Sequence, residues 1–176
     1  MTEVLRAGLL AGLRVLVAAP PGVASFAPLV AARSTALGAA VEQTEVNPVG
    51  DEVGVEGEVG VLVWDASPVG SALGAIDGAW LAVRPVATGA MTGGGLIVLL
   101  APPPDGVQAE ASRSGLETMA RTLSIEWARL AIRPVAILPG AATPASEVAE
   151  LVAYLASPAG AYFAGCRFDL GGVSEA

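Results

Sequence analysis

The chain of 176 residues has no histidine and no lysine, and its one cysteine is Cys166. These absences exclude histidine-based acid–base catalysis, metal sites built from histidine and cysteine, Schiff-base lysines and the phosphate-binding lysine of P-loops. A lone cysteine allows no internal disulfide and is typical of a cytoplasmic protein, which is the localisation we expect. A mechanism that relies on paired carboxylates is not excluded.

Charged residues are also scarce, at 15% of the chain against 53% hydrophobic residues. An ordinary globular domain has about 25% charged residues. Too few charges are present to cover the surface of a solitary globule, so we expect part of the surface to face another subunit. The alternative is a surface unusually rich in alanine and glycine.

The charge distribution argues against two further classes of partner. The net charge is −8 and the nine arginines form no run, which argues against nucleic-acid binding. No apolar run reaches the length of about 18 residues that a membrane-spanning helix needs. The apolar N-terminal stretch has Glu3 ahead of Arg6 and is interrupted by Arg14, so we expect no secretory signal and no membrane association.

Short apolar runs alternate with helical patterns along the chain. This alternation predicts a single Rossmann-like domain over residues 1–176, a three-layer α/β/α sandwich with a shortened parallel sheet. The pattern of residues 73–91 predicts a helix, and Pro85 should kink it. The acidic segment 42–58 is expected to be a solvated loop. The predicted strands are 13–19, 40–46, 60–64, 96–101, 133–138 and 166–170, and the predicted helices are 25–37, 73–91, 111–130 and 146–155.

Two C-terminal segments resemble a known family, the short-chain dehydrogenases/reductases. The first is SRSGLETMARTLSIEWARLAIRPVAILPG (112–140), which resembles the family's active-site helix and following strand, SKxxLxxxxxxLAxEWAxxGIRVNxIxPG. The second is EVAELVAYLASPAGAYFAGCRFDLGG (147–172), which resembles the family's last helix and its xGxxxxVDGG ending. In the N-terminal half, LVWDAS and GGGLIVLLA stand where the family has LVNNAG and GGxIVxxSS. The resemblance implies a Rossmann-like fold related to NAD(P)-dependent oxidoreductases.

The residues that the resemblance makes catalytic are missing. Ala109 stands where the family has its proton-donating tyrosine, and Arg113 where it has the lysine that lowers the pKa of that tyrosine. The family serine falls near Ala101 or in the proline run 102–104, and the family asparagine near Ala75. Alanine supplies no proton, so the resemblance implies no catalytic residue in this chain.

The family's glycine-rich cofactor loop is also missing. Glycines there let the backbone approach a pyrophosphate and direct helix N–H groups at it. The aligned segment 18–25 keeps only Gly22 of these glycines, while Ala19, Val23 and Ser25 add side chains and Pro20 and Pro21 remove donors. We therefore expect this chain to bind no cofactor and no metal. An acidic residue, Glu42 or Glu45, stands roughly where a ribose ligand would lie, which we interpret as coincidence.

The segments that remain are those through which the family assembles. Residues 44–58 and 141–145 are too short for the strand–helix unit and the substrate loop that the family carries there, whereas the long helix, the helix before it and the C-terminal segment are kept. We therefore expect a non-catalytic subunit that pairs with and stabilises a full-length, active short-chain dehydrogenase/reductase, as a heterodimer or heterotetramer.

In that assembly NAD or NADP is expected in the partner subunit. The breadth of the family implies a partner that acts on a hydroxyacyl-CoA, hydroxyacyl-carrier-protein or steroid-like substrate, and the tail 162–176 is expected to reach its pocket. Small residues of the long helix, Gly115, Thr118 and Thr122, line a second side of that helix. For any one interface residue, packing in the chain's own core is the simpler explanation. The expected interface residues are Leu116, Met119, Ala120, Leu123, Trp127, Trp80 and Phe163.

Two alternatives stay open. The first is a divergent stand-alone NAD(P)-dependent oxidoreductase, in which Arg113 or carboxylates at strand ends, Asp65 and Asp105, take new roles. Such carboxylates are more often helix caps or solvated turns. The second alternative is a homodimeric ligand-binding or regulatory module.

Overall fold

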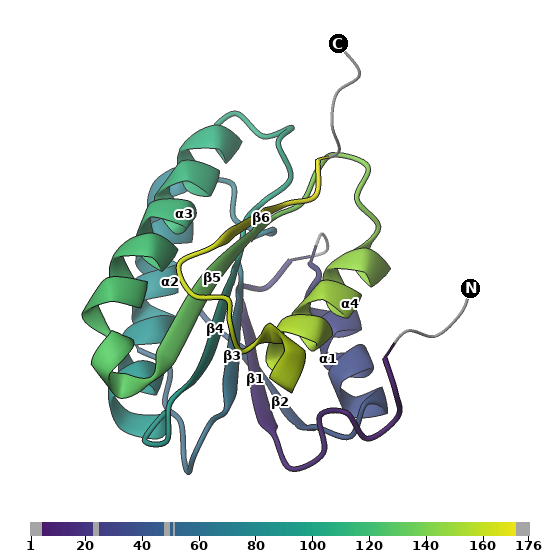
Figure 1. Ribbon diagram of the computed structural model, residues 1–176. Helices are drawn as coiled ribbons and strands as arrows, with labels where there is room; N and C mark the ends of the chain where they lie inside the picture. The colour runs from purple at the N-terminus through teal and green to yellow at the C-terminus, as the bar shows by residue number, and fades with distance from the viewer. Residues whose placement is uncertain (1–4, 23–24, 48–49, 51, 172–176) are drawn as a thin grey trace.

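A six-stranded parallel sheet is the centre of the computed structural model, which describes residues 5–22, 25–47, 50 and 52–171. The strand order is β2-β1-β3-β4-β5-β6, and helices cover both faces of the sheet (Figure 1). This arrangement confirms the predicted shortened, Rossmann-like α/β sandwich. The strands are β1 (Arg14–Ala19), β2 (Ala40–Glu45), β3 (Val61–Asp65), β4 (Gly95–Leu100), β5 (Ile132–Leu138) and β6 (Arg167–Asp169).

The helices form one layer on each face of the sheet. Helices α2 and α3 lie on one face and α1 and α4 on the other (Figure 1). The inner strands are almost entirely buried and are apolar except for Arg14, Asp65 and Arg133, as expected for parallel strands covered on both sides. The α-helices among the described residues are α1 (Ala27–Ala36), α2 (Ala72–Pro85), α3 (Ala109–Glu126) and α4 (Ala145–Ala156).

Local sequence signals fix several helix ends. Pro28 lies in the first turn of α1, where its missing N–H costs little, and Gly38 follows the helix with a φ of 97°. Ser71 begins α2, because its Oγ accepts a hydrogen bond from the Gly74 N–H at 3.1 Å. The N-terminal cap of α1 is different, because Phe26 has no polar side chain and the helix takes its cap from elsewhere in the chain.

Two predicted helices differ from the observed ones at their C-terminal ends. The helix predicted over 73–91 ends at Pro85, and the chain continues as a π-helical turn, Val86–Ala90, in which the Met91 N–H donates to the Val86 carbonyl at 3.0 Å. The long helix predicted to reach residue 130 ends at Glu126 and is followed by a 3₁₀ turn. Ala131 then adopts a left-handed φ of 55°, a conformation that terminates helices.

The connection from β2 to β3 crosses the sheet without a helix in its described residues. It runs over the face that α2 covers, where the Val53 N–H donates to the Leu81 carbonyl at 3.3 Å and the Val59 N–H to the Ala90 carbonyl at 2.9 Å. Both valine side chains are buried in the core on the α2–α3 side. A short extended segment therefore covers the sheet here, and β2 is left as an edge strand.

Acidic residues of this region are used in ion pairs. Glu42 on β2 pairs with Arg14, and Glu52 pairs with Arg84 of α2, so the segment predicted as a solvated loop is tied to its neighbours. In residues 5–22, 25–47, 50 and 52–171 there is no group of three acidic, histidine or cysteine side chains placed to hold a metal ion. The helices in the described part of the chain are too short or too polar to span a lipid bilayer.

We predict that the apolar contacts of the β2–β3 connection stabilise the fold. Replacing the fully buried Val59 in the Val59→Ala variant should lower the free energy of unfolding by about 2 kcal/mol, because it leaves a cavity beneath the connection. The matched control is Val107→Ala, since Val107 is fully exposed and its replacement should change little. Denaturant unfolding measures both variants, and equal stabilities would contradict the prediction.

Candidate functional site

The carboxyl edge of the sheet is where a parallel α/β fold forms its site. Ligands bind there at the point where the strand order reverses. In this chain that point lies between β1 and β3, because the chain leaves β1 toward β2 and then returns across the sheet to β3. The N-terminus of α1 and the end of β3 meet at this position.

Asp65, the last residue of β3, is fully buried at this point. Its Oδ2 accepts three hydrogen bonds: from the Ser25 hydroxyl at 2.8 Å, the Phe26 N–H at 2.7 Å and the Ala27 N–H at 2.9 Å. Its Oδ1 accepts a fourth, from the Ser67 N–H at 2.9 Å. Asp65 is therefore the cap of α1, although it lies about 40 residues away in the sequence.

The capped helix has no free N–H group left in its first turn. Phe26 and Ala27 donate to Asp65, Pro28 has no N–H, and the Leu29 N–H donates to the Phe26 carbonyl at 3.1 Å. A phosphate group needs such free donors at a helix N-terminus, and here it would instead face a carboxylate. The described N–H groups of the first turn of α1 are therefore not free to bind a phosphate group.

Gly22 of the segment before α1 lies against a side chain of the β3–α2 connection. A Cβ at Gly22 would lie 2.6 Å from the Cβ of Pro68, so the Gly22 backbone packs directly on the β3–α2 connection. Val23 and Ala24, the middle of the loop, lie outside the described residues. Shallow cavities remain on either side of the two prolines, one of about 370 Å³ beside β2 and one of about 500 Å³ beside Asn47 and Pro68.

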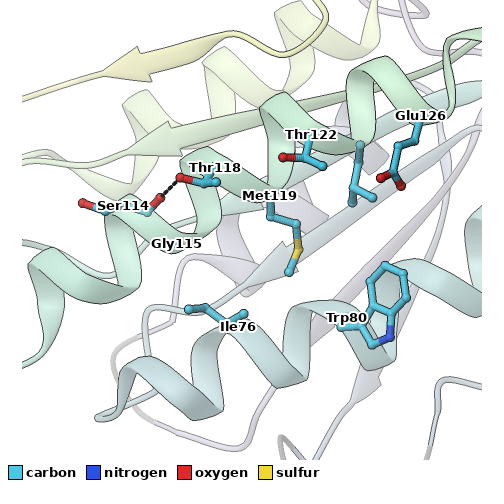
Figure 2. A pocket seen from close by; sticks show the side chains of 9 residues that line it. Ile76, Trp80, Ser114, Gly115, Thr118, Met119, Thr122 and Glu126 are labelled. Atoms are coloured by element: carbon cyan, nitrogen blue, oxygen red, sulfur yellow. Dashed lines mark hydrogen bonds between the residues drawn. The ribbon is translucent and has the colours of Figure 1, made fainter.

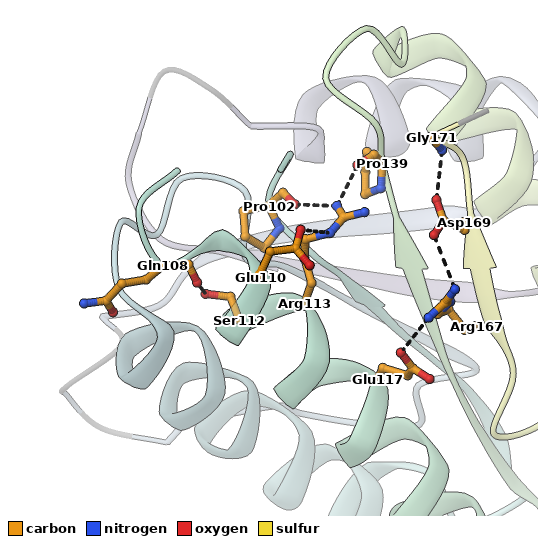
Figure 3. Close-up of polar contacts among 10 residues, drawn as sticks. All are labelled: Pro102, Gln108, Glu110, Ser112, Arg113, Glu117, Pro139, Arg167, Asp169 and Gly171. Atoms are coloured by element: carbon orange, nitrogen blue, oxygen red, sulfur yellow. Dashed lines mark hydrogen bonds and ion pairs between the residues drawn. The ribbon is translucent and has the colours of Figure 1, made fainter. Parts of the chain in front are cut away.

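Arg113, at the position of the family lysine, is nine-tenths buried and used within the chain. Figure 3 shows its guanidinium reaching two backbone carbonyls, Pro102 at 2.9 Å and Pro139 at 2.7 Å, with Glu110 3.6 Å away. These carbonyls follow β4 and β5, so Arg113 ties the carboxyl ends of the two strands to α3. A proline follows each strand in the sequence, Pro102 two residues after β4 and Pro139 directly after β5, which indicates where the strands end and not that Arg113 binds these carbonyls.

The other positions of the expected tetrad carry no reactive group. Ala101, Ala75 and Ala109 are buried methyl groups, and Asp105 is exposed on the β4–α3 connection. Asp65 as a cap and Asp105 in a solvated turn follow the simpler expectation for carboxylates at strand ends. In the described residues at this edge the arrangement satisfies backbone groups, and it brings together no acid–base pair.

A second polar cluster joins the last strand to the long helix. The Arg167 guanidinium on β6 lies 3.1 Å from Glu117 of α3 and 3.5 Å from Asp169 (Figure 3). The hydrogen bond and the charge of Glu117 raise the pKa of Arg167. Glu117 also pairs with Arg121, one turn further along α3, at 2.8 Å. The cluster is exposed, so it contributes modestly to stability.

An apolar groove lies on the outer face of α2 and α3, with a volume of about 590 Å³. The helices approach closely at Gly115, where a Cβ would lie 2.4 Å from the Cδ1 of Ile76. We call this surface the α2–α3 groove. Figure 2 shows its lining side chains: Ile76, Trp80, Ser114, Gly115, Thr118, Met119, Thr122, Leu123 and Glu126.

The structure separates the expected interface residues into different regions. Leu116, Ala120 and Leu123 face the sheet and are buried in the core, which is the simpler explanation for any one of the expected interface residues, although Leu123 reaches the floor of the groove. Their spacing of four and three residues is that of the sheet-facing side of α3. Trp80, which is 42% exposed, and Met119 do line the groove together.

The remaining two expected residues lie away from the groove lining. Trp127 packs half-buried against the core at the end of α3. Phe163 belongs to an aromatic group on the α4 side, with ring centroids 6.2 Å from Tyr154 and 5.3 Å from Phe168. Gly115, Thr118 and Thr122, which the sequence placed on another side of the helix, are the residues that line the groove.

Solved structures with the same architecture identify the fold. A short-chain dehydrogenase from Mycobacterium smegmatis matches with a TM-score of 0.75 and 20% identity, over 100% of this chain and 98% of that chain. The chain has the short-chain dehydrogenase/reductase fold. A citronellol catabolism dehydrogenase from Pseudomonas aeruginosa PAO1 matches with a TM-score of 0.72 and 22% identity, over 96% and 98% of the two chains. A 3-ketoacyl-(acyl-carrier-protein) reductase from Brucella melitensis, complexed with NADH, matches with a TM-score of 0.73 and 18% identity, over 93% and 98%.

Sequence comparisons add nothing to this fold assignment. A scan of protein-family models finds no match, and a search of curated proteins finds none either.

We predict that Arg113 is a structural residue. The Arg113→Ala variant should lose about 3 kcal/mol of stability, because two buried carbonyls lose their donor. Arg121→Ala is the matched control on the same helix: its side chain is 67% exposed, and its loss should cost less than about 0.5 kcal/mol. Denaturant unfolding compares them, and an Arg113→Ala variant as stable as Arg121→Ala would refute the role.

Proposed function

We propose that this chain is a non-catalytic subunit that pairs with and stabilises a catalytically active short-chain dehydrogenase/reductase. The observation that carries the proposal is the use of the carboxyl edge by the chain's own groups. Asp65 takes the donors of α1, and Arg113 takes the carbonyls beside β4 and β5. Because the chain's own side chains occupy the position where this fold binds its ligand, we infer that its function lies in association through its outer surface.

The α2–α3 groove is the surface that we propose for pairing. It is mostly apolar, and Trp80 projects from α2 at its edge while Leu73 and Ile125 expose 69% and 75% of their surface on the same two helices. Apolar side chains of this size gain free energy when a partner covers them. The threonines of α3 are short, so a helix of the partner subunit is able to approach the backbone closely.

In this proposal NAD or NADP is bound by the partner, and this chain binds neither. The solved structures of the same fold include, by their names, enzymes of ketoacyl-carrier-protein reduction and citronellol catabolism. We therefore propose a partner that acts on a hydroxyacyl-CoA, a hydroxyacyl-carrier-protein or a steroid-like substrate. A role for the tail 162–176 in the partner's pocket remains part of this proposal, and residues 172–176 lie outside the described residues.

One observation favours the alternative, a divergent stand-alone NAD(P)-dependent oxidoreductase: a reductase of the same fold was solved with NADH. That alternative needs a proton donor near the cofactor, and Ala109 and Ala101 supply none. Binding of a nicotinamide cofactor by this chain alone distinguishes the stand-alone oxidoreductase from the non-catalytic subunit.

We predict that pairing depends on the α2–α3 groove. Co-expressed with a full-length short-chain dehydrogenase encoded beside it, the chain should purify as a stable complex, whereas the chain alone should aggregate. Trp80→Asp should weaken the complex at least about tenfold, because a large apolar side chain of the groove would be replaced by a charge that the partner has to bury. Leu29→Asp is the matched control, since Leu29 is similarly exposed on α1, on the opposite face.

Dilution of the purified complex, followed by analytical gel filtration, measures the dissociation constant for both variants. Equal affinities for Trp80→Asp and Leu29→Asp would exclude the groove as the contact surface. A lone chain that stays monodisperse and forms no complex with the neighbouring dehydrogenase would overturn the pairing itself.

We also predict that the chain has no saturable affinity for NADH or NADPH. Nicotinamide fluorescence should stay unchanged when the chain is added, because α1 has no free donor for the pyrophosphate. Restoring the two family residues with Ala109→Tyr and Arg113→Lys should give no reductase activity. Micromolar binding of either nucleotide by the wild-type chain would favour the stand-alone oxidoreductase.

A further inference from the structure

We propose that the α2–α3 groove accepts an apolar helix of a different subunit that carries a lysine or arginine, and not a second copy of this chain. The proposal rests on the proposed function and deepens it, because it names the chemistry of the partner surface. It also decides between pairing with another protein and self-pairing, by which we mean two copies of this chain joined through the groove. The residue that recognises the partner's cation is Glu126, at one end of the groove.

The groove combines apolar side chains with one carboxylate. Of the described residues that line it, only Glu126 is charged, and Figure 2 shows this carboxylate at the same end of the groove as the Trp80 ring. Glu126 is exposed and has no ion pair or hydrogen bond from its side chain within the described part of the chain. A partner that covers the apolar side chains also removes water from this carboxylate. That desolvation costs free energy unless a cation of the partner compensates for it.

The arginines on the outer face of α2 and α3 are already paired within the chain. Arg84 of α2 pairs with Glu52, and Arg121 of α3 pairs with Glu117, which also contacts Arg167 on β6. These guanidinium groups are therefore not available to a carboxylate across an interface. Seven of the nine arginines are held within the chain by ion pairs or by hydrogen bonds to carbonyl groups: Arg14, Arg33, Arg84, Arg113, Arg121, Arg133 and Arg167.

The two other arginines, which the structure also describes, lie away from the groove. Arg6 belongs to the N-terminal segment, whose Leu5 packs on the side of the sheet that α1 and α4 cover. Arg129 lies on the 3₁₀ turn after α3 and lines a separate cavity with Thr88 and Thr92. The chain has no lysine. A second copy therefore brings no free arginine or lysine to the groove.

Self-pairing would instead bring carboxylates together. Two copies that pair through the same surface are related by a twofold axis. If the axis crosses the helices, Glu126 of one copy approaches the opposite end of the groove in the other, at Ile76 and Ser114. The exposed acids there are Asp77, next to Ile76, and Glu110, one turn before Ser114. If the axis runs along the helices, the two Glu126 side chains meet. Neither arrangement supplies a cation, and each copy has a net charge of −8.

The first experiment measures the dissociation constant of the purified complex with the neighbouring dehydrogenase, by dilution and gel filtration at low and high salt. Glu126→Lys should weaken the complex at least about tenfold, because it places two cations opposite each other. Glu126→Gln should weaken it about threefold and should reduce its salt dependence, because the amide no longer attracts the partner's cation. Both variants change an exposed side chain, so the fold should be kept.

Glu45→Lys is the matched control for the change in net charge. Glu45 is exposed on the edge strand β2, away from α3, so the same reversal of charge should change the affinity by less than about twofold. A complex that responds to Glu126→Lys no more than to Glu45→Lys would contradict the proposal.

The second experiment tests for self-pairing directly. Thr118 lines the groove between its two ends, so self-pairing would bring the two Thr118 side chains near the twofold axis (Figure 2). A chain with Thr118→Cys and Cys166→Ser should give no disulfide-linked dimer of itself when its complex is oxidised with diamide. Ser146→Cys in the same Cys166→Ser chain, an exposed position on α4, reports random cross-linking.

The outcomes separate this proposal from the pairing on which it rests. A dimer of this chain cross-linked through residue 118, above the level of the Ser146→Cys control, would show that a second copy occupies the groove and would refute the proposal. Such a result, or an affinity indifferent to Glu126, leaves the complex with the dehydrogenase standing. Failure to form any complex would overturn the proposed function and this proposal with it.

Discussion

Backbone donors and acceptors at the carboxyl edge of a parallel sheet need hydrogen-bond partners, and this requirement explains how the helices of this chain are held to the sheet. In a cofactor-binding α/β fold, a bound ligand supplies some of these partners. In this chain Asp65 accepts from the start of α1, and Arg113 donates to the carbonyls that follow β4 and β5. The same two side chains hold α1 and α3 to the sheet, so the site region acts as a brace between the layers.

Much of the architecture follows from local sequence. The apolar, β-branched runs of the inner strands are buried on both faces, and this pattern alone predicts a parallel sheet between helical layers. Pro28 and Gly38 predict the two ends of α1 to within about two residues. The end of α2 was less predictable. Proline breaks the regular bonding, but whether the chain then bends or forms a π-helical turn depends on packing that the sequence pattern does not encode.

The candidate site was predictable only in what it lacks. The missing tyrosine and glycines are visible in the sequence, whereas the new contacts of Asp65 and Arg113 join elements that lie 11 to 40 residues apart. Which side of α3 faces outward was not predictable for a related reason. Both sides of that helix are apolar or small, so only the position of the sheet shows that Leu116 faces inward and Thr118 outward.

The edge strand β2 has a consequence for how copies of this chain meet. No described strand pairs with its outer edge, and Glu42, Gln43 and Glu45 have exposed side chains there. Strands that add to such an edge would bring like charges together, in a chain whose net charge is already −8. Polymerisation by strand addition at β2 is therefore disfavoured, even when no partner subunit covers the α2–α3 groove.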